Sequence, residues 1–238
     1  MALPHPAPRF DRQDYFVWET EQPVKHEYVA GEVFAQAGAR YQPAKLEFYQ
    51  GGGQSGCGAA QAAMGPFYCP ADQKVYIDTA FFKDMRTQMG IGGEQNQTEL
   101  ARQDQAGDFA QAYVVAHEVG HHIQTILGIS EQVQKARAQG SKAQGNALSV
   151  RQELQADCLA GVWAHHNNQR TQFLEQGDVE EAMDAAHKIG DDYLQKRATG
   201  QVVPDSFTHG TSQQRMTWFG MGFKSGQVES CDTFNQAI

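Results

Sequence analysis

A long and largely buried helix is the feature that most constrains how this 238-residue chain can fold. From Phe109 to Leu127 apolar residues recur at helical spacing, while Asp108 can cap the start and Gly128 can end the helix. The segment "VVAHEVGHHIQ", residues 114–124, adds three histidines and a glutamate. Burying such side chains is costly unless each finds a polar partner. The helix therefore predicts either a metal site or core histidines that bond to carbonyl groups.

The histidine spacing favours the metal site. His117 and His121 lie four residues apart, so a helix presents both imidazoles to one ion. Glu118 projects beside them and can take a proton from a water molecule at that ion. His122 is turned away by about 100° and is not needed. The H-E-x-x-H pattern thus predicts two zinc ligands and a general base.

A catalytic zinc ion takes three protein ligands and keeps one position open. Our candidate for the third ligand is Glu153, in "RQELQADCLAG" on a second helix expected to start at Ser149. Asp157 is four residues further on and can accept a ring N–H from a ligand histidine. His165 and His166 compete for the third place, although at the end of that helix they also suit its dipole.

His209 lies in "DSFTHGTSQQR", just before a last helix expected to begin near Thr211. Beside a glycine, its ring can point into a cleft and stabilise the oxyanion of a tetrahedral intermediate, with Arg215 as a second candidate helper. A histidine that caps the loop or bonds near Asp157 explains the same residues equally well.

The rest of the chain predicts an α+β fold that is mostly helical with a small edge sheet. Residues 1–33 differ in character and form a separate arm, followed by one domain over 34–238. The alternation in "KVYID", residues 74–78, predicts a strand, and a helix follows to about Gly90. Residues 91–107 are a polar connection. A third, amphipathic helix is expected from Asp178, with Glu181 completing a capping box, to about Ala198.

Composition excludes several functions. Asp and Glu number 28 against 19 Lys and Arg, and no basic run could follow a phosphate backbone, so nucleic acid is not an expected partner. The chain contains no apolar stretch of the roughly 20 residues that a membrane span needs, and its start lacks a signal-peptide core. On these features alone it would remain in the cytoplasm.

The four cysteines lack the C-x-x-C spacing of a thiolate zinc site. An even number allows three disulfide pairings, and a bridge between Cys57 and Cys69 would fix a glycine-rich segment. Four reduced thiols are the alternative in the cytosol.

From about residue 34 to the end, the chain resembles the bacterial family of "putative neutral zinc metallopeptidases". The resemblance rests on six stretches: "YQPAKLEFY", "CGAAQAAMGPFYCPADQKVYID", "GDFAQAYVVAHEVGHHIQ", "RQELQADCLAGVWAHH", "SFTHGTSQQR" and "CDTF". It implies a zincin-like metallopeptidase domain that binds one zinc ion per chain. The implied zinc ligands are His117, His121 and Glu153, and the implied catalytic residues are Glu118 and His209.

The resemblance also implies a peptide or protein substrate that pairs with an edge strand, for which "KVYID" is our candidate. Members of the family typically carry an N-terminal membrane anchor and face outside the cytoplasm. In such a compartment, disulfides Cys57–Cys69 and Cys158–Cys231 are implied.

Residues 1–34 depart from this pattern. The stretch "RFDRQDYFVWETEQPVKHEYVAGEVFA" is similar to the start of a bacterial restriction-endonuclease-like family, but the likeness stops after Phe34, before the carboxylates and lysine of such a nuclease. We therefore interpret it as a fusion remnant. Two alternatives to an active peptidase follow: a catalytically inactive zinc-binding scaffold that binds a partner, and a DNA-binding protein of the nuclease type.

Overall fold

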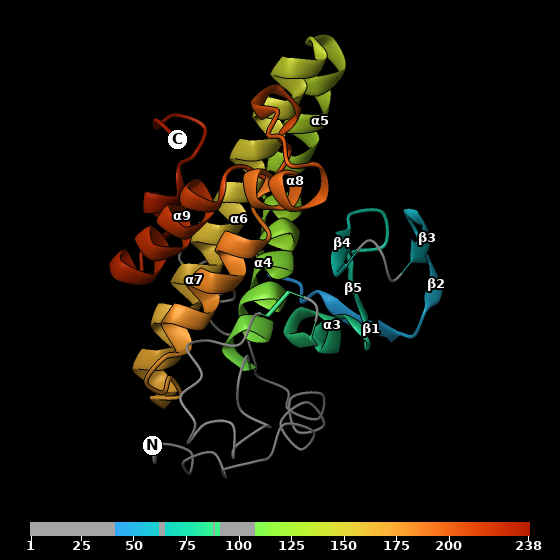
Figure 1. The fold of residues 1–238 in the computed structure, drawn as a ribbon. Coiled ribbons are helices and arrows are strands. Elements are labelled where there is room, and N and C mark those ends of the chain that lie inside the picture. Colours follow the sequence, from blue (N-terminus) through green and yellow to red (C-terminus); the bar gives the residue numbers. More distant parts are fainter. Residues whose placement is uncertain (1–40, 62–64, 88, 91–107) are drawn as a thin grey trace.

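The computed structural model describes residues 41–61, 65–87, 89–90 and 108–238, where the chain is mostly helical with two small sheets. Helices α4 to α9 gather on one side and the strands, with the short helix α3, lie on the other, and helix α4, Asp108–Ile126, contacts the strands as well as the helices (Figure 1). The expected α+β, mostly helical fold class is confirmed. Among the described helices, none has the length and apolar character that crossing a bilayer requires.

The larger sheet has the order β1-β5-β4. Strand β1, Lys45–Tyr49, pairs in parallel with β5, Lys74–Asp78, and β4, Phe67–Cys69, pairs with β5 in the antiparallel direction. A separate hairpin joins β2, Gly52–Ser55, to β3, Gly58–Gln61. The sheet that faces α4 therefore ends in β4.

The segment "KVYID" is a strand as predicted, but it is not an edge strand. It forms β5, which is hydrogen-bonded on both sides, so a peptide cannot add to it. Its last four residues are all buried, as expected for a strand covered on both faces. Alternation along five residues predicts a strand but carries no information on its number of neighbours. The edge next to α4 belongs to β4.

The helices agree with the sequence analysis in position more than in length. Helix α6 begins seven residues earlier than expected, at Lys142, because Ser141 and Gln144 form a capping box there. The predicted third helix is two helices, broken where Gly190 lies too close to the backbone of Ser212 for a side chain to fit. The remaining helical segments are α3, Phe81–Thr87; α5, Ile129–Gln139; α6, Lys142–Thr171; α7, Asp178–Lys188; α8, Asp191–Thr199; α9, Ser212–Ser225; and the 3-10 turns Pro204–Ser206 and Val228–Cys231.

Small residues let α6 approach its neighbours closely. A Cβ on Gly161 of α6 would overlap the carbonyl oxygen of Phe219 in α9, and one on Gly222 would overlap that of Cys158. On the other side of α6, a Cβ on Gly120 of α4 would lie 3.0 Å from the Cα of Ala156. Helix α6 is therefore packed between α4 and α9.

Two disulfides cross-link the sheet region and the C-terminal region of the described chain. Cys57–Cys69 joins the β2–β3 turn to β4, and Cys158–Cys231 joins α6 to the segment after α9. Both pairings implied by the family resemblance are present. The predicted arm and the connection over residues 91–107 lie outside the described residues.

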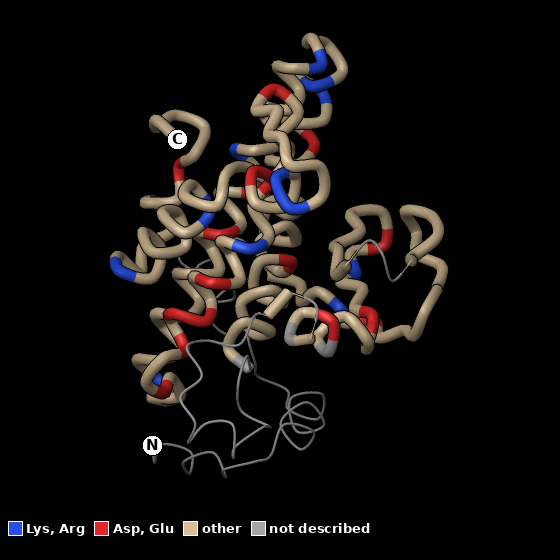
Figure 2. Tube along the Cα trace, viewed as in Figure 1, with Lys and Arg blue, Asp and Glu red and all other residues tan. Residues whose placement is uncertain are grey.

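Charged side chains are spread over the helices. Figure 2 shows Lys and Arg scattered among Asp and Glu, without a basic stripe along the described part of the chain.

Candidate metal centre

The three predicted ligands come together where α4 crosses α6. Nε2 of His117 lies 3.1 Å from one carboxylate oxygen of Glu153, and Nε2 of His121 lies 3.4 Å from the other. One donor atom from each residue can be chosen so that all lie within 4.8 Å of one another. Two helix-borne histidines and a carboxylate on the facing helix thus converge on one point.

This donor set fits a zinc ion. Two imidazole nitrogens and one carboxylate oxygen are the ligands of a known class of catalytic zinc sites. His165 and His166, the competing candidates, bond instead to the carbonyl oxygens of Phe223 and Gly226, at 2.7 Å each. The geometry therefore favours Glu153 as the third ligand.

Asp157 holds the first histidine in place. Its Oδ1 lies 2.8 Å from Nδ1 of His117, which is the contact that the four-residue spacing predicted. Because an ionised carboxylate only accepts, Nδ1 carries the ring proton and Nε2 faces Glu153. The hydroxyl of Tyr113 donates to the same oxygen at 2.6 Å.

Arg215, the second candidate helper for the oxyanion, is buried and bonded to Asp157. Only 3% of the residue is exposed, and its Nε and Nη2 donate to the two oxygens of Asp157 at 2.9 Å each. The guanidinium thus neutralises a carboxylate that is itself fully buried. These bonds hold the Asp157 carboxylate, which in turn contacts His117.

The electrostatics of the cluster follow from these pairs. Burial alone would raise the pKa of Asp157, but Arg215 and His117 lower it to about 2. Burial alone would lower the pKa of His117, but Asp157 and Glu153 raise it to about 10. For Glu153, the nearby histidines overcome the effect of burial and hold the pKa well below its usual range. The carboxylates therefore favour positive charge at this point. In the metal-free chain this positive charge comes from protonated histidines.

Glu118 lies beside the ligands and is 8% exposed. Burial raises its pKa, and the charges of His121 and His117 offset only part of this rise. A hydrogen bond from the backbone amide of Tyr68, in β4, also lowers the pKa of Glu118. The edge strand β4 therefore lies next to this carboxylate. A carboxylate with a raised pKa accepts a proton more readily than an exposed one.

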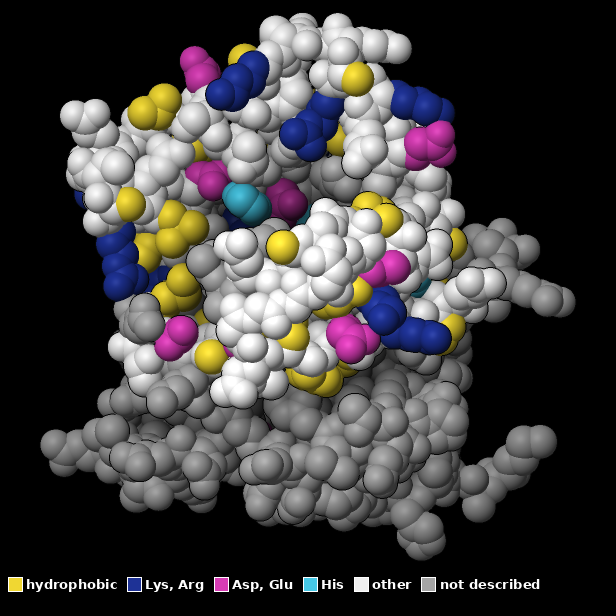
Figure 3. Space-filling model, turned by 90° about the vertical axis from the view of Figure 1, so that its right-hand side faces the viewer, with side chains coloured by type: hydrophobic (Ala, Val, Ile, Leu, Met, Phe, Trp, Pro, Cys, Tyr) yellow, Lys and Arg dark blue, Asp and Glu magenta, His cyan; other side chains and the backbone are white. Residues whose placement is uncertain are grey.

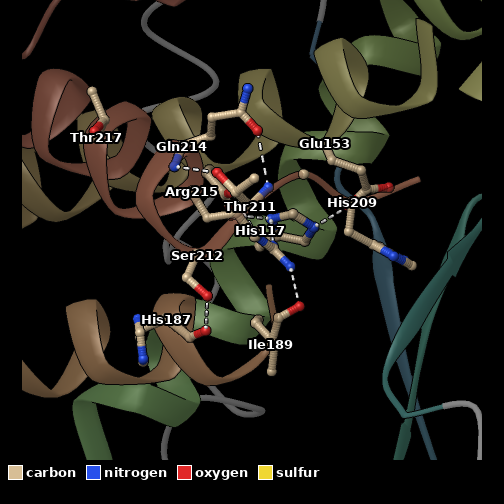
Figure 4. A network of polar contacts seen from close by, with 12 residues as sticks. His117, Glu153, His187, Ile189, His209, Thr211, Ser212, Gln214, Arg215 and Thr217 are labelled. Atoms are coloured by element: carbon tan, nitrogen blue, oxygen red, sulfur yellow. Dashed lines mark hydrogen bonds and ion pairs between the residues drawn. The ribbon is translucent and has the colours of Figure 1, made fainter. Parts of the chain in front are cut away.

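His209 lies on the loop before α9, and Figure 4 shows it beside Glu153. Asp191 determines the conformation of this loop, since its Oδ2 accepts hydrogen bonds from the backbone N–H groups of Thr208, His209 and Gly210, at 2.7, 2.7 and 3.1 Å. Its Oδ1 lies 3.1 Å from Nδ1 of His209. The ring is half exposed. On one face of the molecule, histidine and acidic side chains lie together in a hollow (Figure 3).

His122, which the sequence set apart from the ligands, connects α4 to the sheet region. Its Nδ1 lies 3.0 Å from the hydroxyl of Tyr68, and its Nε2 lies 2.6 Å from the carbonyl oxygen of Gln42. This fully buried ring therefore has its own polar partners.

Sequence comparison identifies relatives of the chain. The family described as "Putative neutral zinc metallopeptidase" matches residues 19–234. The match begins inside residues 1–33, so the domain boundary expected at residue 34 stays a prediction. Uncharacterized protein YpfJ of Escherichia coli is 52% identical over 208 residues, which are 87% of this chain and 67% of that protein. Uncharacterized protein Rv2575 of Mycobacterium tuberculosis is 40% identical over 206 residues, 83% of this chain and 64% of that protein.

The chain thus spans about two thirds of the length of these curated relatives. No solved structure matches it. With the family matched over most of its length, and a histidine, histidine and glutamate cluster at the expected positions, the chain belongs to the "Putative neutral zinc metallopeptidase" family.

Proposed function

We propose that the protein is a zinc-dependent endopeptidase. The observation that carries this proposal is the convergence of His117, His121 and Glu153 within 4.8 Å, next to the buried carboxylate of Glu118. These three side chains would hold one zinc ion per chain. Zinc bound in this way supplies Lewis-acid chemistry, since it lowers the pKa of a water molecule to about 7 and polarises a carbonyl group.

The chain's own residues would move the protons. Glu118 accepts a proton from the attacking water molecule at its carboxylate and later donates it to the leaving amine nitrogen. His209 donates a hydrogen bond to the substrate oxygen on which negative charge develops. Asp157 keeps the proton of His117 on Nδ1, so that Nε2 stays available as a ligand.

We place the peptide substrate along β4. Extended peptides add to exposed sheet edges through main-chain hydrogen bonds. Strand β4 ends the sheet on the side of α4, and its Tyr68 amide lies next to Glu118. A substrate paired with this edge would pass the catalytic carboxylate, whereas β5 is already paired on both sides.

The test is substitution of Glu118 by Gln. General acid–base catalysis contributes a factor of about 100 to 10,000, so hydrolysis of a denatured protein should fall by that factor while zinc content stays unchanged. Glu180→Gln, at an exposed position of α7, is the matched control. Peptidase activity near that of the parent in the Glu118 variant would overturn the mechanism.

Zinc content tests the site separately. Elemental mass spectrometry should find about one zinc ion per chain in the parent and a marked loss in Glu153→Ala. A parent that binds zinc but hydrolyses no denatured protein would be the inactive scaffold instead. A folded parent that takes up no zinc would show that the histidines are structural.

A further inference from the structure

A chain of two side-chain amides, one fully buried and one partly buried, ends on the ring of His121. Gln124 is fully buried, and its Oε1 lies 2.9 Å from Nδ1 of His121. Its Nε2 donates to the carbonyl oxygen of Gln152 at 2.7 Å and to Oε1 of Gln155 at 3.1 Å. Nε2 of Gln155 donates in turn to the carbonyl oxygen of Cys231 at 3.1 Å. The contacts thus run from a candidate zinc ligand to the C-terminal segment.

The direction of every hydrogen bond in this chain follows from its two carbonyl groups. A carbonyl oxygen only accepts, so the NH2 group of Gln155 faces Cys231 and that of Gln124 faces Gln152. Each amide therefore presents its oxygen on the other side, Gln155 to Gln124 and Gln124 to His121. Because Nδ1 of His121 faces an acceptor, it must carry the ring proton. Nε2 is the remaining ring nitrogen and lies 3.4 Å from a carboxylate oxygen of Glu153, where a bound zinc ion would take the place of the proton on Nε2.

We propose that Gln124 and Gln155 form an amide relay that positions His121 to bind zinc through Nε2. The inference rests on the zinc site proposed above and adds two positioning residues to it. The two histidines then differ in support, since His117 donates to the carboxylate of Asp157 and His121 donates to a neutral amide. Both partners fix the tautomer, but only the carboxylate adds negative charge.

The far end of the relay is held covalently. Cys231 forms a disulfide with Cys158, and Cys158 lies in α6 together with Gln155. The carbonyl oxygen that orients Gln155 is therefore tied to the helix that carries this residue. The relay joins α4, α6 and the C-terminal segment around one ligand.

The first experiment observes the tautomer in the zinc-loaded full chain. In protein labelled with 15N at histidine, long-range 15N–1H correlation should show that His121 has a proton on Nδ1 and is metallated at Nε2. This N–H should exchange slowly with water because the ring is enclosed. Metallation through Nδ1, or a proton on Nε2, would overturn the proposal without any variant.

The second experiment removes the amide. Gln124→Met keeps the length of the side chain but cannot orient the ring, so the zinc dissociation constant, measured by chelator competition, should rise about 10- to 100-fold. Gln155→Met should give a smaller rise, because Gln124 keeps its bond to Gln152. Gln134→Met, at an exposed position of α5, is the control and should bind zinc as the parent does.

The relay would be contradicted if the Gln124→Met variant bound zinc as tightly as the parent and its His121 N–H still exchanged slowly with water. If Gln124→Met does not fold, Gln155→Met and the tautomer of the parent decide the question. None of these measurements uses peptide hydrolysis. A protein that binds zinc but cleaves nothing would therefore sink the proposed peptidase and leave the relay standing, whereas a folded parent without zinc would overturn both.

Discussion

At the scale of single residues, the position of one proton determines what His209 can offer a substrate. Asp191 only accepts when ionised, so the ring donates to it from Nδ1. Nε2 can then donate only if the ring is protonated. The hydrogen bond to Asp191 raises the pKa of His209 and so favours this charged form. We therefore expect His209 to act as an oxyanion donor below its raised pKa and to lose that role as the pH rises through it.

Asp191→Asn tests this expectation. Without the carboxylate, the pKa of His209 should fall, and the alkaline limb of kcat/KM should move to lower pH. Asp192→Asn is the control, because Asp192 accepts from Ser212 and makes no hydrogen bond to His209. A full pH profile of each variant distinguishes the two cases. An alkaline limb that does not move in Asp191→Asn would exclude the protonated ring as the donor.

Helical spacing in the sequence was sufficient to predict which side chains come together at the candidate metal centre. It placed His121 with His117, and Asp157 with Glu153, because four residues make one face of a helix. The same spacing could have revealed Tyr113, four residues before His117, which shares the Asp157 oxygen. The pairing of Arg215 with Asp157 was not predicted, because the two residues lie 58 positions apart on different helices and only the packing of α9 on α6 brings them together.

At the scale of elements, the packing of α9 against α6 fixes the residues that surround the candidate metal centre. Helix α6 carries Glu153 and Asp157, and α9 carries Arg215. The two backbones meet at Gly161 and Gly222, where a Cβ would overlap the facing helix. The distance between these helices therefore controls the Arg215–Asp157 pair.

Gly222→Ala should separate the two helices. Forcing an extra methyl group into a packed interface typically costs about 1–3 kcal/mol, so the free energy of unfolding should fall by this amount. Gly220→Ala lies on the same helix, and its Cβ would meet only the terminal carbon of Met183, at 3.0 Å. A flexible methionine can move, so this control should stay near the parent. Equal chemical denaturation curves for the two variants would contradict the close crossing.

Element boundaries were the least predictable part of the fold. The break between α7 and α8 follows from the approach of Gly190 to the start of α9, which no local pattern reveals. Strands β1 to β4 were not located: β1 is largely exposed, β2 and β3 are exposed and rich in small residues, and β4 is only three residues long. The start of α9 near Thr211 was predicted, and in the structure a capping box of Thr211 and Gln214 stabilises this start.

At the scale of the whole molecule, the metal centre lies between two parts that are each closed by a disulfide. Cys57–Cys69 fixes β4, the edge strand beside Glu118, and Cys158–Cys231 fixes the C-terminal segment that ends the amide relay. From the residues alone, three disulfide pairings remained possible. The family resemblance was needed to choose between them. The mostly helical class followed directly from the long apolar periodicity.

The two disulfides should differ in their contribution to stability. A cross-link stabilises the folded state mainly by restricting the unfolded chain, and more so for a longer loop. The loops here span separations of 12 and 73 residues, which correspond to about 3 and about 4 kcal/mol. Replacing Cys158 and Cys231 by Ser should therefore lower the free energy of unfolding more than replacing Cys57 and Cys69.

Zinc affinity separates the roles of the two bridges further. Loss of Cys158–Cys231 releases the carbonyl group that orients Gln155, so zinc should bind more weakly. Loss of Cys57–Cys69 should leave zinc affinity unchanged and raise KM, because β4 is the proposed docking edge for the substrate. Denaturant unfolding, chelator competition and steady-state kinetics on both double variants test this division. Equal zinc affinity in the two variants would mean that the C-terminal segment does not support the metal centre.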